Sequence, residues 1–99
     1  MDIQTKPEMS IAQKGERFKV FKVTGIKGMQ MPSHYSTKEA VIIVLQGEAM
    51  LNLTEKQIHL KVNDSAIIPA NEPHTLLIKE TLQANVIMEI DSEIKFINK

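Results

Sequence analysis

Histidine is the residue in this chain best suited to chemistry near neutral pH. There are three, His34, His59 and His74, and there is no cysteine. An imidazole can accept a proton, donate one or bind a metal ion, because its pKa lies close to physiological pH. Without cysteine, neither a thiolate metal site nor a disulfide framework can form. The sequence also lacks a phosphate-binding loop, a nucleophile elbow and a zinc-protease helix motif.

The chain around the histidines has the alternation of half-buried β-strands, and glycine, asparagine and proline interrupt it at short intervals. No stretch keeps the three-and-four spacing of an amphipathic helix. The pattern predicts an all-β barrel or sandwich. We expect strands, each a few residues long, at 17–24, 26–31, 40–45, 48–54, 58–62, 65–69, 74–79, 85–90 and 94–97. The expected turns include 46–47, 63–64 and 79–83.

The 99 residues predict one domain at 15–99, preceded by a loose N-terminal arm at 1–14. Twelve basic side chains balance twelve acidic ones, so the net charge gives no indication of a nucleic-acid or anionic-membrane partner. The N-terminus lacks an apolar signal segment, and the longest apolar run is too short to span a membrane. We therefore expect a cytoplasmic protein. A homodimer is expected to cover the sheet edges of so small a β domain.

The segment 64–74, DSAIIPANEPH, resembles the second conserved motif of the cupin superfamily. In that motif a strand ends at proline, a short loop follows, and the next strand begins with an inward histidine. Pro69, Asn71, Pro73 and His74 lie at the matching positions, while Asn63 replaces the usual glycine. The resemblance covers about residues 18–90 and implies a small jelly-roll β-barrel, which agrees with the strand pattern.

The segment 34–47, HYSTKEAVIIVLQG, has the outline of the first cupin motif. That motif has two histidines one residue apart, a glutamate four residues later and a hydrophobic strand that ends in glycine. Counted back from Gly47, His34 is the first histidine, but Ser36 replaces the second and Ala40 replaces the glutamate. The resemblance therefore implies a metal site that keeps only His34 and His74 of its ligands.

Several functions for these residues remain open. Two imidazoles seldom hold an exchangeable divalent transition metal, because catalytic sites normally provide at least three protein ligands. Glu39 lies beside the missing position, but on a strand it points to the opposite face from Ala40 unless a bulge shifts the register. His59, in another strand, is expected at the surface. His34 and His74 can instead orient a small polar ligand or exchange protons with it.

Tyr35 and Ser36 can add hydroxyl groups to such a ligand site. The sequence therefore favours a cupin barrel that binds a small polar organic ligand without a tightly held metal. One alternative is a metal-dependent enzyme, such as a dioxygenase or isomerase, that uses His34, His74 and Glu39. Another is a structural or sensory dimer whose barrel is filled by side chains, several of them from the six methionines. All three interpretations are compatible with the resemblance, because one fold carries many chemistries.

Overall fold

The computed structural model describes residues 6–97, which form eight β-strands and no helix long and apolar enough to cross a membrane. All the strand pairs are antiparallel, so the all-β prediction is confirmed. The strands are β1 Glu8–Lys14, β2 Phe18–Gly25, β3 Gln30–Ser36, β4 Ala40–Asn52, β5 Gln57–Leu60, β6 Ser65–Ile68, β7 His74–Glu89 and β8 Ile94–Phe96.

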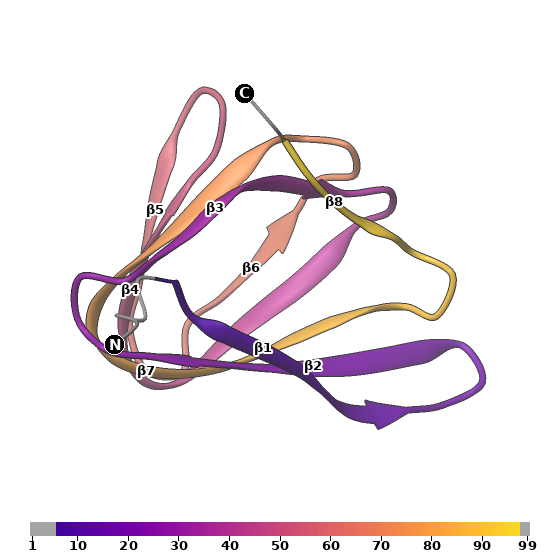
Figure 1. Ribbon diagram of the computed structural model, residues 1–99, viewed down its shortest axis with the longest axis horizontal. Coiled ribbons are helices and arrows are strands. Elements are labelled where there is room, and N and C mark those ends of the chain that lie inside the picture. Colours follow the sequence, from indigo (N-terminus) through magenta and orange to yellow (C-terminus); the bar gives the residue numbers. More distant parts are fainter. Residues whose placement is uncertain (1–5, 98–99) are drawn as a thin grey trace, which may run out of the picture.

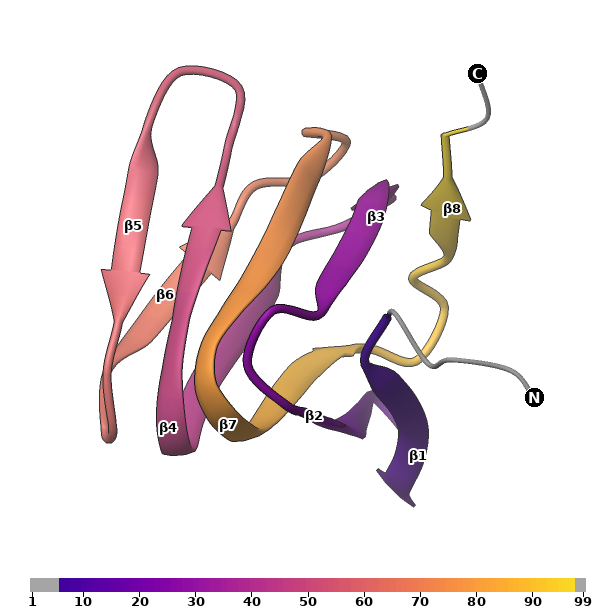
Figure 2. The ribbon, with the colours of Figure 1, turned by 60° about the vertical axis from the view of Figure 1, so that its left-hand side comes forward.

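Two long strands, β4 and β7, run side by side through the whole molecule and bend midway (Figures 1 and 2). On one side of the bend, the sheet continues from β7 to β2 and β1 and from β4 to β6. On the other side, β7 pairs with β3, which pairs with β8, and β4 pairs with β5. The sheet therefore curls on itself, and residues on its inner face from both halves share one core.

The bend lies at Gly47 and corrects two expectations from the sequence. The chain does not form a hairpin at 46–47 or a turn at 79–83; it continues through both segments as strand. Gly47 has a φ of +86°, and a Cβ atom there would lie 2.0 Å from the carbonyl oxygen of Thr81. Glycine is required because its absent side chain allows β4 and β7 to stay in contact while both change direction.

The N-terminal arm differs from expectation as well. Residues 8–14 form β1, which pairs with β2 around a bulge between Ile11 and Gln13; residues 1–5 of the predicted arm lie outside the described residues. β1 is mostly exposed, and Met9 is its only half-buried residue. With one face in solvent and little apolar alternation, the segment has no strong strand signal in its sequence.

The core fills the inner face of the curl. Ala40, Ile42 and Val44 of β4 alternate inward in one half, and Ala49 and Leu51 do so in the other. The buried positions of β7 alternate in the same way on both sides of its exposed bend at 79–81. Alternation along a strand directs every second side chain to one face, so both long strands contribute to the core on both sides of the bend.

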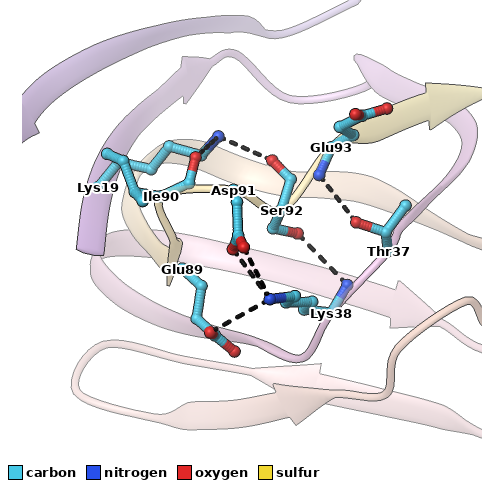
Figure 3. A network of polar contacts seen from close by, with 8 residues as sticks. All are labelled: Lys19, Thr37, Lys38, Glu89, Ile90, Asp91, Ser92 and Glu93. Atoms are coloured by element: carbon cyan, nitrogen blue, oxygen red, sulfur yellow. Dashed lines mark hydrogen bonds and ion pairs between the residues drawn. The ribbon is translucent and has the colours of Figure 1, made fainter. Parts of the chain in front are cut away.

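A network of polar contacts attaches the segment between β7 and β8 to its neighbours (Figure 3). The Nζ atom of Lys19 donates to the carbonyl oxygens of Ile90 and Ser92, at 3.0 and 2.8 Å. The Nζ atom of Lys38 lies 2.9 Å from a carboxylate oxygen of Asp91, and the backbone N–H of Lys38 donates to the buried hydroxyl of Ser92. These contacts hold the segment that leads into β8, which contributes to the site below.

Candidate functional site

β3 and β7 bring His34 and His74 together on the inner face of the sheet. The two residues are direct partners in the β3–β7 register, and their ring centroids lie 4.3 Å apart with an interplanar angle of 61°. His34 is 7% exposed and His74 is 5% exposed. The two rings therefore contact each other from adjacent strands.

Both rings are oriented by the backbone. The Nδ1–H of His34 donates to the carbonyl oxygen of Pro32 at 2.7 Å, and the Nδ1–H of His74 donates to that of Glu72 at 3.0 Å. A carbonyl oxygen can only accept, so each neutral ring carries its proton on Nδ1 and keeps a lone pair on Nε2. No hydrogen bond among the described residues uses either Nε2 atom.

The loop before β7 positions the second histidine. Asn71 has a φ of +64°, which asparagine tolerates better than most residues, and its N–H donates to the carbonyl oxygen of Ser36 at 2.7 Å. This bond attaches the loop to the end of β3. The loop therefore fixes the distance between the strand that carries His34 and the strand that His74 begins.

Burial keeps both imidazoles neutral. It lowers the pKa of His34 and of His74 below the ordinary value of 6.5, because a charged ring loses solvation in the core. The backbone hydrogen bonds at Nδ1 oppose this effect but are weaker than it, and the nearby His34 lowers the pKa of His74 further. At neutral pH, the two Nε2 atoms are therefore hydrogen-bond acceptors or proton acceptors.

The two histidines line a narrow cavity between the halves of the sheet. The centre of a water-sized sphere can occupy about 30 Å³ of it, which is little beside the 300–1,000 Å³ or so of common ligand pockets. Its size suits a few water molecules or one compact molecule. The lining residues are Met9, Val23, Met31, His34, Ser36, Ile42, Leu51, His74, Leu76, Val86, Met88 and Ile94.

Only one of the other predicted site residues lies in the cavity wall. Ser36 is buried and lines the cavity with His34. Tyr35 lies between them in the strand, is half-buried and does not line the cavity. Glu39 is exposed and also lies outside the cavity wall. The structure thus brings His34, His74 and Ser36 together and separates Tyr35 and Glu39 from them.

The donors at this site do not fit a divalent transition metal of the kind that the first cupin motif implies. Over residues 6–97, no group of three or more histidine, cysteine, aspartate or glutamate side chains is placed to hold a metal ion. Two imidazoles remain, with no carboxylate in the wall to balance a double charge. Metal sites with exchangeable ligands usually need three protein donors, whereas this wall offers two imidazoles.

Sequence reasoning missed some of the surroundings of the site. Phe96 of β8 lies beside His34, with ring centroids 5.2 Å apart, and Ile94 lines the cavity. Met9 reaches the cavity from β1, which the sequence predicted as a loose arm. Residues 94–97 were predicted as a strand, so alternation from Ile94 could have indicated the position of Phe96. No signal in the sequence indicated Met9.

Comparison with known proteins identifies the family. Residues 22–90 match the family model described as a cupin domain. The chain belongs to the cupin family. A segment of 44 residues is 39% identical to an uncharacterized HTH-type transcriptional regulator of Haemophilus influenzae. The match covers 44% of this cupin and only 15% of the regulator.

Solved structures share the fold at low sequence identity. An uncharacterized conserved protein with a double-stranded β-helix domain from Klebsiella pneumoniae has a TM-score of 0.81 and 18% identity, over 100% of this chain and 90% of that one. A cupin-like protein from Thermotoga maritima has a TM-score of 0.81 and 19% identity, over 92% of this chain and 75% of that one. At these identities the likeness shows the double-stranded β-helix fold and nothing finer.

Proposed function

We propose that this cupin binds a small polar organic ligand between His34 and His74, without a tightly held divalent metal. One observation carries the proposal: two buried, neutral imidazoles have their Nδ1 protons bonded to the backbone and their Nε2 lone pairs without a protein partner. Neither Nε2 atom is among the fully enclosed side-chain polar atoms without a partner in the described part of the chain, so both remain accessible to a water or ligand that can donate to them.

The experiment is a screen of small metabolites by thermal unfolding, with the metal content of the same protein measured in parallel. A ligand that binds the folded state raises the melting temperature. We expect a hit to lose its effect in His34→Ala and in His74→Ala, and to keep it in His59→Ala, because His59 lies on the outer face of β5 and contacts Glu48. A stoichiometric divalent metal that both cavity variants lose would overturn the proposal in favour of a metal-dependent enzyme.

A second candidate is a sensory domain with a nearly filled barrel. Two observations favour it: the cavity is narrow, and part of the chain is similar to a transcriptional regulator. This candidate predicts no hit in the screen and a barrel that tolerates Ser36→Ala without loss of stability, since a filled cavity needs no polar wall. A hit that depends on both histidines would reject it.

The homodimer expected from the sequence remains a proposal. β1, β5, β6 and β8 each have one paired neighbour among the described strands, so each has an edge available for contact with another copy. Light scattering at micromolar concentration tests this proposal, and the mass of a single chain would exclude a dimer.

A further inference from the structure

The wall of the cavity carries no formal charge. No lysine, arginine, aspartate or glutamate is among its lining residues, and apart from His34, Ser36 and His74 the lining side chains are hydrocarbon or thioether groups. A charged ligand inside would therefore lack a counter-ion. Transfer of an unpaired charge from water into such surroundings is strongly unfavourable.

The polar atoms of the wall are chiefly acceptors. Each Nδ1–H is already donated to a backbone carbonyl oxygen, so the rings of His34 and His74 offer the cavity only the Nε2 lone pairs. Ser36 adds one hydroxyl group, which can donate or accept. Two acceptors close together favour a ligand that brings N–H or O–H donors to them.

A carboxylate does not match this wall. Its oxygens have lone pairs only, so they would face the lone pairs of the two imidazoles, and its charge would lose hydration without gaining a cationic partner. A ketone has no charge, but it likewise lacks a donor and would leave both Nε2 atoms unpaired. An ammonium ion could donate to the Nε2 atoms, but the cavity wall has no carboxylate to balance its charge.

We propose that this cavity selects compact, uncharged molecules that carry N–H or O–H donors on an apolar body, such as primary amides and short alcohols, and that it rejects carboxylates. This inference rests on the proposed binding function and specifies the ligand class. The donor group lies between the Nε2 atoms of His34 and His74, and the apolar body contacts side chains such as Leu51 and Val86.

Three molecules with the same heavy-atom skeleton test the selection: isobutyramide, isobutyrate and isopropyl methyl ketone. The amide is neutral and has donors, the carboxylate is charged and has none, and the ketone is neutral and has none. Binding is followed by NMR on protein with 15N-labelled histidine, at a slightly alkaline pH that keeps the imidazoles neutral. We expect the amide to bind at least about tenfold more tightly than either isostere, because unpaired buried acceptors are costly.

The 15N signals of wild-type protein locate the contact without any substitution. Isobutyramide should shift the Nε2 resonances of His34 and His74 and leave those of His59 unchanged, since His59 lies outside the cavity. In the double variant with His34→Leu and His74→Leu, the preference for the amide over the ketone should disappear. Equal binding of all three molecules, tighter binding of isobutyrate, or no binding of the amide would each overturn the inference.

Failure of this inference is distinct from failure of the proposed function. If isobutyrate binds best and its binding depends on both histidines, the site is real but its ligand class is different. If a metabolite hit keeps its effect in the His34→Ala and His74→Ala variants, the proposed site itself is wrong.

Discussion

The three histidines occupy two contrasting environments. His34 and His74 lie on the inner face of the sheet, donate Nδ1–H to backbone carbonyl oxygens and are almost fully buried. His59 lies on the outer face, exposed, with its Nε2 atom 2.6 Å from a carboxylate oxygen of Glu48. The same side chain is thus an acceptor facing a cavity in one place and a surface partner of a carboxylate in the other. Position on the pleat, rather than residue type, determines which chemistry is available.

The largest effect on stability is expected when a lysine is placed on the inner face of the sheet, and the same substitution on the outer face is its control. Leu51 lines the cavity and is 1% exposed, whereas Met50 is half-buried on the outer face, opposite His59 in the β4–β5 register. We expect Leu51→Lys to lower the free energy of unfolding by about 3 kcal/mol or more, because the ammonium is buried without a partner. Met50→Lys should cost about 1 kcal/mol or less.

Urea unfolding followed by circular dichroism measures both variants. The two positions are adjacent in sequence and receive the same substitution. The difference between their losses in free energy of unfolding therefore measures the effect of the face alone. Similar losses in the two variants would mean that the cavity face is wetter than the structure indicates.

Acidification should have an intermediate effect on stability, through the buried His34 and His74. The folded-state pKa values of His34 and His74 are lowered, so below the ordinary value of 6.5 the unfolded chain takes up protons before the folded one does. The stability is fully present above pH 6.5 and declines as the pH falls towards the folded-state pKa. Each pH unit between the two pKa values contributes about 1.4 kcal/mol per histidine.

Melting temperatures measured across this window test the sign. The double variant with His34→Leu and His74→Leu should show a shallower decline than the wild type, even if its overall stability differs. A wild-type protein that becomes more stable on acidification between neutral pH and the onset of carboxylate titration would contradict the burial of these rings.

The smallest effect is expected on the outer face. Glu48→Gln removes the charge beside His59 and should change the free energy of unfolding by about 1 kcal/mol or less, because both side chains are partly exposed to water. Chemical denaturation resolves such a change when the wild type and the variant are fitted with the same dependence of the free energy of unfolding on denaturant concentration. A loss above about 2 kcal/mol would show that the pair has a structural role comparable to that of the inner pair.

Sequence reasoning predicted the site better than its walls. The two motif resemblances singled out the site residues: counting back from Gly47 gave His34 and Ser36, and the segment 64–74 gave His74. The strand pattern did not place His34, because the strand expected at 26–31 ends before it, whereas β3 covers Gln30–Ser36. Met9 and Phe96 reach the site from the two ends of the chain, and only the assembled sheet shows that they meet there. The size of the cavity depends on how these distant side chains pack, which no local pattern encodes.

The sequence predicted the all-β class but not the bend that β4 and β7 share. Gln46 and Gly47 have the composition of a hairpin turn, and local propensity favours that structure. Whether a glycine reverses the chain or bends it depends on what lies opposite, and here the opposite residue is Thr81, in a strand distant in sequence. The strand at 8–14 was missed for a related reason, since its pairing with β2 rather than its own apolar content holds it.

The bend shared by β4 and β7 has a consequence for cooperativity. Each of these strands belongs to both halves of the sheet, so neither half can lose its pairing without disturbing the backbone on which the other depends. We therefore expect a single unfolding transition for the barrel rather than separate openings of the two halves. A ligand held in the cavity beside His34 and His74 would then protect amide hydrogens as far away as β1 and β6 from exchange, although it touches neither strand's backbone.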